Sequence, residues 1–161
     1  FNWTIYPRFS ELKNRFGEVI EYVEIVDRIE FEINGLRFVP VSVNHKVPAT
    51  GFLISDADST IAITGDTAET EEFWKVVNDR GPITALFIEC AFPNEFDELS
   101  TISHHLTPRK LLLELGKFEN QNCPIYVINI KPAYRSAVVG QLESLGIPRL
   151  EILETGREYQ L

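Results

Sequence analysis

The sequence predicts a mixed α/β fold, of α+β type, in which an antiparallel meander is followed by strands that alternate with helices. The meander is indicated by residues 29–33, where apolar and polar side chains alternate with the period of a half-buried strand. Asn34-Gly35 follows at once, and this pair is a strong signal for a two-residue hairpin turn. In the second half, helix candidates alternate with apolar strand candidates, which is the pattern of βα units on a sheet.

The first half is expected to continue as antiparallel sheet. The further strands predicted there are residues 36–43, 51–55 and 60–64, the last two joined by the polar turn 56–59. Pro40 predicts an edge position or a break, because proline cannot donate a hydrogen bond in a ladder. Residues 8–16, ahead of the meander, are predicted to be weakly helical.

The second half changes its rhythm. The strands predicted there are residues 83–89, 124–130 and 149–153, and the helices are residues 69–79, 108–118 and 133–145. Thr107 is expected to cap the second helix, and Gly146 to end the third. With no linker or repeat in the sequence, residues 1–161 are predicted to form a single domain with helices on the outer face of a mixed sheet.

Composition narrows the classes of protein. Of 161 residues, 15 are Lys or Arg and 24 are Asp or Glu, which gives a net charge of −9. Such an acidic balance argues against a nucleic-acid partner, because phosphate binding depends on Lys and Arg. No apolar run reaches the roughly 18 residues of a membrane span, so no membrane partner is expected. The chain contains no Met and opens on Phe1, which favours a fragment, a processed product or omitted methionines.

Two cysteines, Cys90 and Cys123, lie far apart and beside apolar, strand-like segments. Such placement predicts reduced thiols in the core rather than a disulfide or a metal pair. A cytoplasmic location is therefore expected.

Polar side chains follow several predicted strands at the point where each strand ends. His45, Asp66, Glu89 and Asn129 hold these positions. Polar groups that converge at strand ends are how α/β sheets build sites, and imidazole with carboxylate suits Zn, Mn or Fe. Two plainer interpretations stay open: His45 as a surface or capping residue, and Asp66 as an Asx turn or helix cap.

His104 and His105 lie just ahead of a predicted helix. Neighbouring side chains in such a segment point in different directions, so we expect at most one of them to face a site. A solvated loop ahead of the helix cap is the alternative.

The candidate site residues lie in or beside an ordered series of motifs that resembles a known family. The motifs are Gly65-Asp66-Thr67 after residues 51–54 and 61–64, Glu89-Cys90-Ala91-Phe92-Pro93, His105-Leu106-Thr107-Pro108 and Ile130-Lys131-Pro132. In this order they resemble the metallo-β-lactamase superfamily, and within it the class II cyclic-nucleotide phosphodiesterase branch, which is related to tRNase Z. The resemblance implies the C-terminal portion of an αββα sandwich.

The resemblance also implies roles. His45 matches a metal ligand of the family, and Asp66 matches the aspartate that bridges two metal ions, as a carboxylate with two oxygens can do. His105 matches the general acid that protonates the leaving oxygen. Glu89 matches the acidic residue that orients that histidine. His104 has no counterpart and is treated as a neighbour.

Two departures from the family pattern stand out. The motif His-x-His-x-Asp-His, which supplies most of the family's metal ligands, is absent and is expected upstream of Phe1. Asn129 stands where the family has a histidine that binds the second metal. An amide is a poorer zinc ligand than imidazole but can serve a harder ion. Asn129 is therefore kept as a metal candidate at a weakened second site.

The function implied is a metal-dependent phosphodiesterase that cleaves a cyclic nucleotide or a similar small phosphodiester by attack of a metal-bound hydroxide. Its cofactor would be one or two divalent ions, with Zn first and Mn or Fe as alternatives. Two other functions stay open: an inactive binding module of the same fold, and a tRNase Z-like endoribonuclease. The oligomeric state is left open, with a homodimer as one option.

Overall fold

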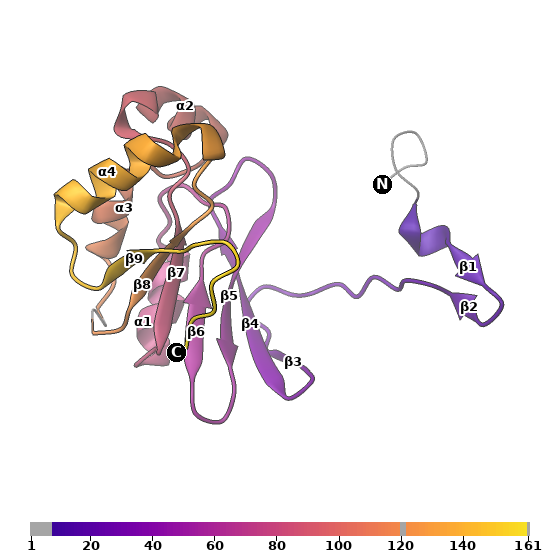
Figure 1. The fold of residues 1–161 in the computed structure, drawn as a ribbon. Helices are drawn as coiled ribbons and strands as arrows, with labels where there is room; N and C mark the ends of the chain where they lie inside the picture. The colour runs from indigo at the N-terminus through magenta and orange to yellow at the C-terminus, as the bar shows by residue number, and fades with distance from the viewer. Residues whose placement is uncertain (1–7, 120–121, 161) are drawn as a thin grey trace.

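A computed structural model describes residues 8–119 and 122–160 (Figure 1). Its main feature is a seven-stranded sheet in the order β3-β4-β5-β6-β7-β8-β9. The strands are β3 (Phe31–Ile33), β4 (Leu36–Val43), β5 (Ala49–Ser55), β6 (Thr60–Ile63), β7 (Ala85–Glu89), β8 (Ile125–Ile128) and β9 (Leu150–Ile152). The pairs from β3 to β6 are antiparallel and those from β6 to β9 are parallel. The predicted meander followed by βα units is confirmed.

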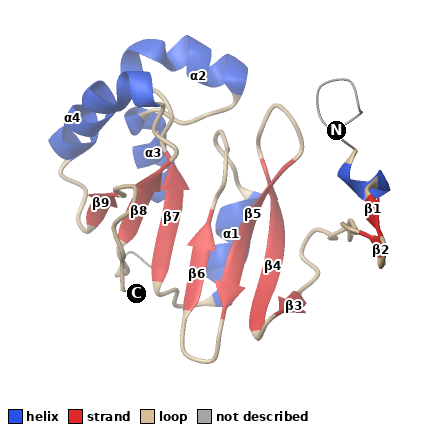
Figure 2. Cartoon of the chain, turned by 45° about the vertical axis from the view of Figure 1, so that its right-hand side comes forward, coloured by secondary structure: helices blue, strands red, loops and turns tan. Residues whose placement is uncertain are grey.

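Three helices cover one face of this sheet: α1 (Glu72–Arg80), α3 (Pro108–Leu115) and α4 (Arg135–Leu145). Figure 2 shows α1 behind the strands. Leu53 and Leu86 point to this face, and both belong to the buried cluster that contains Phe73 of α1 and Leu142 of α4. The expected helical layer on a mixed sheet is therefore present.

The meander turns where the sequence places the turn. Ile33 pairs with Leu36, so Asn34 and Gly35 alone make the turn, with φ of 52° and 82°. Positive φ at both positions is the requirement of a type I′ turn. Pro40 lies inside β4, but its carbonyl accepts a hydrogen bond from the Arg28 N–H on the β3 side. Its ring nitrogen therefore faces away from β5, so proline removes no bond of that ladder.

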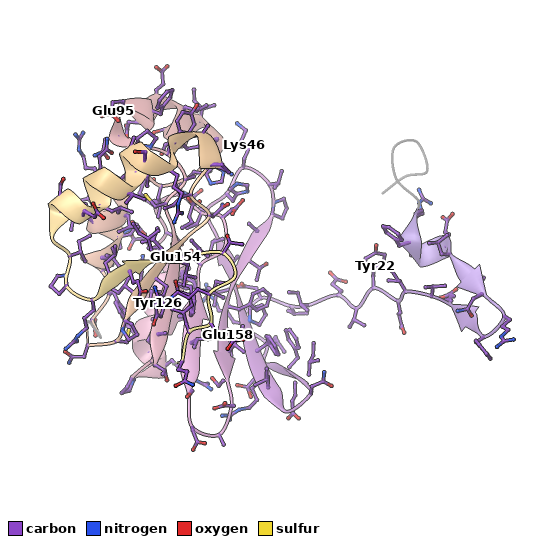
Figure 3. All side chains as sticks on the ribbon, viewed as in Figure 1. Tyr22, Lys46, Glu95, Tyr126, Glu154 and Glu158 are labelled. Atoms are coloured by element: carbon purple, nitrogen blue, oxygen red, sulfur yellow. The ribbon has the colours of Figure 1, made fainter. Side chains whose placement is uncertain are left out.

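The prediction of a weak helix over residues 8–16 is wrong. A short 3₁₀ turn, η1 (Phe9–Glu11), is followed by a hairpin of β1 (Lys13–Asn14) and β2 (Gly17–Glu18). The Asn14 side chain accepts a hydrogen bond from the Phe16 N–H, and Gly17 has a φ of 124°. This turn chemistry overrides a weak helical preference. Figure 3 shows Tyr22 on the extended segment that joins this hairpin to the sheet.

Several boundaries differ from the prediction. The predicted strands 83–89, 124–130 and 149–153 are shorter at one or both ends, and α1 and α3 cover only part of the predicted helices 69–79 and 108–118. Two further short elements were not predicted, η2 (Asn94–Phe96) and α2 (Asp97–Ser103), and the predicted helix 133–145 is divided between η3 (Pro132–Tyr134) and α4. Both predicted helix ends are confirmed, because Thr107 accepts the Lys110 N–H and Gly146 ends α4 with a φ of 59°.

Both cysteines are free and buried, as predicted. Burial, and secondarily the negative charge of Glu89, raise the pKa of the Cys90 thiol well above its usual range. Burial also raises the pKa of Cys123. Neither thiol is therefore ionised at neutral pH, which suits a core residue rather than a nucleophile. In the described part of the chain no helix is long and apolar enough to cross a membrane.

Replacing Gly51 with alanine is expected to lower the free energy of unfolding by roughly 1–3 kcal/mol, the usual cost of overpacking. A Cβ at Gly51 would lie 2.8 Å from the Ile63 carbonyl oxygen and 2.8 Å from Phe73 Cε2. Urea denaturation measures the change. Gly140→Ala is the matched control, because its Cβ meets nothing within 4 Å inside α4. The free energy of unfolding of this control should rise by roughly 0.5–1 kcal/mol. Equal losses of stability in the two variants would contradict the close packing around Gly51.

Candidate metal centre

The sheet topology brings four strand ends to one edge. β4 is antiparallel to β5, and β5 to β6, so β4 runs in the same direction as β6, β7 and β8. The carboxyl ends of these four strands therefore lie at one edge. His45, Asp66, Glu89 and Asn129 stand at or within three residues of those ends.

Three side chains at this edge have the geometry of a metal site. The ligand atoms of His45, Asp66 and His105 all lie within 4.8 Å of one another. The ring centroids of His45 and His105 are 5.1 Å apart. His45 Nδ1 is buried and has no hydrogen-bond partner among the described residues. A buried polar atom without a partner is costly, and a bound cation would satisfy it.

The donor set also fits a divalent ion. Imidazole nitrogens and carboxylate oxygens are ligands that zinc takes in proteins, and manganese and iron accept the same donors. Asp66 and His45 are half-buried, whereas His105 is buried. The centre is therefore partly enclosed but can be reached from solvent.

Glu89 holds His105 in place. Its side chain is fully buried at the end of β7, and its Oε1 accepts hydrogen bonds from His105 Nδ1 at 2.7 Å and from the Thr67 N–H at 2.8 Å. Its Oε2 lies 3.3 Å from the Leu106 N–H, which donates to it. Because a carboxylate only accepts, His105 Nδ1 carries the hydrogen. The other ring nitrogen, Nε2, is left for the centre.

Asn129 lies against Asp66. Its Nδ2 donates a hydrogen bond to Asp66 Oδ1, and its backbone has a φ of 57°. Asparagine tolerates this left-handed conformation better than most residues. The structure thus brings Asn129 to the predicted edge of the sheet. Its role as a metal ligand, like the roles of His45 and Asp66, stays a prediction.

His104 points elsewhere. It ends α2 with a φ of 57°, and its Nδ1 lies 2.9 Å from Asn44 Oδ1. Asn44 is in turn held by the Glu69 carbonyl oxygen, to which its Nδ2 donates. The two neighbouring histidines therefore face different surroundings, as expected, and only His105 belongs to the cluster with His45.

Sequence reasoning missed one buried acid, which supports the loop between β6 and α1 that carries Asp66. Glu114 of α3 is 1% exposed and accepts hydrogen bonds from the Thr70 N–H and from Trp74 Nε1. Lys117 donates a third at 2.6 Å. Burial alone would lower the pKa of Lys117, but its hydrogen bonds to Glu114 and Glu71 raise it. The only signal in the sequence was an acid inside an apolar helix pattern.

The sequence matches no protein-family model and no curated protein. Solved structures do resemble the chain. The metallo-β-lactamase fold protein YhfI from Bacillus subtilis has a TM-score of 0.67 and 12% identity, over 84% of this chain and 54% of that one. The short form of human tRNase Z has a TM-score of 0.56 and 13% identity, over 77% and 42%.

A third similar structure is the Zn(II)-bound PqqB from Methylobacterium extorquens, with a TM-score of 0.58 and 14% identity, over 85% of this chain and 55% of that one. The chain therefore has the metallo-β-lactamase fold over the part that it spans, as the motif series implied. It spans about half the length of these three proteins. At such low identity, the likeness establishes the fold.

Replacing Glu89 with glutamine is expected to lower the free energy of unfolding by roughly 1–3 kcal/mol. The side chain keeps its shape, but its amide group cannot accept from all three donors, so at least one buried N–H loses its partner. Chemical denaturation measures the change. Glu98→Gln, on the exposed face of α2, is the control and should change the free energy of unfolding by only about a few tenths of a kcal/mol. A Glu89 variant as stable as wild type would contradict this account.

Proposed function

We propose that the chain supplies metal ligands and the proton donor of a metal-dependent hydrolase that cleaves a small phosphodiester, such as a cyclic nucleotide. One observation carries the proposal: the ligand atoms of His45, Asp66 and His105 converge, while a buried carboxylate fixes the His105 ring. A histidine held by an acid beside a divalent-ion site is an arrangement for acid–base chemistry.

His45 and Asp66 would hold the ion, which the buried and unpartnered His45 Nδ1 favours. Zinc is the ion proposed first, with manganese or iron as alternatives. When bound, such an ion supplies a water activated at neutral pH and neutralises charge on the phosphoryl oxygens. Asn129 orients Asp66 by donating to one of its oxygens, which leaves the other oxygen for the ion.

His105 is the proposed general acid. Its Nδ1–H is donated to Glu89, so the ring cannot rotate without breaking a buried hydrogen bond. A proton held at Nε2 is then aimed at the centre, where the leaving oxygen departs. Phe92 packs against the His105 ring in a T-shaped contact, with the ring centroids 5.8 Å apart.

A small substrate is supported by charge. The net charge of −9 would repel a polynucleotide, although a few local cations suffice for a small phosphodiester. Two of the similar structures are described as a tRNase Z and as a diphosphatase of the PhnP family, which supports phosphoryl chemistry. Two free, buried thiols fit a reducing compartment, so a cytoplasmic enzyme is proposed.

Replacing His105 with alanine in the full-length protein is expected to lower kcat by roughly 10²–10⁴-fold, which is the usual contribution of acid–base catalysis. Hydrolysis of cyclic nucleotides and of bis(p-nitrophenyl) phosphate is the assay, and elemental analysis gives the metal content. Metal should be retained in this variant but lost in His45→Ala, because His45 and Asp66 are the proposed ligands and His105 is not.

His104→Ala is the matched control, since its side chain contacts Asn44 outside the cluster. It should leave kcat nearly unchanged. Loss of metal from the His105 variant would place His105 among the ligands. An inactive wild-type protein that contains its metal would refute the hydrolase.

A binding module without catalysis is the second candidate, and Asn129 favours it. Its amide stands where the resemblance places an imidazole ligand, and it donates to Asp66 rather than leaving that oxygen free to bridge two ions. We expect Asn129→His to raise the metal content by up to one ion per chain, measured by elemental analysis. Asn129→Ala, which removes the amide without adding a ligand, should show no such gain. Equal metal content in both variants would mean that position 129 serves structure alone.

A further inference from the structure

A groove of about 410 Å³ lies beside the candidate metal centre, at the carboxyl ends of β8 and β9. Its apolar lining includes Ile128, Ile130 and Leu153, and its polar lining includes Asn129 and Arg135. Asn129 also donates to Asp66 of the centre. Asn129 therefore lines the groove and also contacts a proposed metal ligand, so the groove adjoins the centre.

Two opposite charges line this groove. Arg135, the first residue of α4, has an exposed guanidinium that forms no ion pair or hydrogen bond with the described residues. Glu154 is labelled in Figure 3 on the segment after β9, and among the described residues its carboxylate makes one ion pair, a long and exposed one with Arg157 at 3.8 Å. Both residues also line a neighbouring groove of about 490 Å³, so they stand where the two grooves meet.

The lining selects a class of ligand. A simple anion would be attracted by Arg135 but repelled by Glu154. Both charged side chains are exposed, and an aliphatic group bound in the groove would cover them without offering either one a partner, which costs free energy. A flat heteroaromatic ring with donors and acceptors on its edge satisfies both, and its faces can lie on the aliphatic side chains.

We propose that this groove binds the base of the substrate, a purine with guanine preferred. A guanidinium can donate two parallel hydrogen bonds to guanine O6 and N7, and a carboxylate can accept from guanine N1–H and the N2 amino group. Adenine offers Arg135 a donor in place of O6 and gives Glu154 no matching pair. This inference rests on the proposed nucleotide hydrolase and names the substrate class of the same centre.

The test is a titration of the full-length protein with guanosine 5′-monophosphate and with guanosine, followed by calorimetry or NMR. Arg135→Ala should weaken binding of both probes by roughly 5- to 150-fold, the range for one bidentate base contact. Arg135→Lys keeps the charge but loses the two-pronged contact, so it should lose most of the preference for guanosine over adenosine. Glu154→Gln should reduce the same preference. Arg109→Ala and Glu98→Gln, outside both grooves, are the matched controls.

Guanosine separates this inference from the proposed function, because it contains no phosphate and needs no metal. If the wild-type protein binds guanosine but hydrolyses no phosphodiester, and Arg135→Ala loses guanosine binding, the groove assignment stands and the proposed hydrolase function fails. Guanosine binding that is absent in wild type, or unchanged in the Arg135 and Glu154 variants, overturns the groove assignment. So does an Arg135→Ala variant that loses affinity equally for guanosine 5′-monophosphate and inorganic phosphate while guanosine is unaffected.

Discussion

The buried carboxylate of Glu89 is the interaction on which the candidate centre depends. A carboxylate without access to water is tolerated only when hydrogen bonds satisfy it, and here three donors do so. The donors come from two loops: Thr67 is the neighbour of Asp66, and Leu106 is the neighbour of His105. One side chain at the end of β7 therefore fixes a proposed metal ligand and a proposed acid relative to each other.

Glu114 of α3 repeats this arrangement on the same loop between β6 and α1. It accepts from the Thr70 N–H, three residues beyond the N–H that Glu89 takes, and from the Trp74 indole of α1. The loop between β6 and α1 is thus held at two points by acids from different elements. Buried acids of β7 and α3 therefore position the backbone of the loop that carries Asp66.

Local patterns explain why much of the fold was predictable. Asn34-Gly35 sets a turn by its own dihedral angles, and apolar strands carry their period within a few residues. The strand-end positions of His45 and Asp66 followed from the same patterns. Residues 8–16 were mispredicted because Asn14 and Gly17 make a turn there, and α2 was missed because it is short and largely exposed. Glu114 could not be assigned a role, since its partner Trp74 lies 40 residues away.

The meander also determines which residues can form the centre at all. Parallel strands alone would bring Asp66, Glu89 and Asn129 to one edge, but His45 comes from the antiparallel part of the sheet. Two reversals, from β4 to β5 and from β5 to β6, restore the direction of β4 to that of β6. A single reversal would carry His45 to the opposite edge, roughly 25 Å away for the eight residues of β4. Two reversals between β4 and β6 are thus a condition for a site built from both the antiparallel and the parallel halves of the sheet.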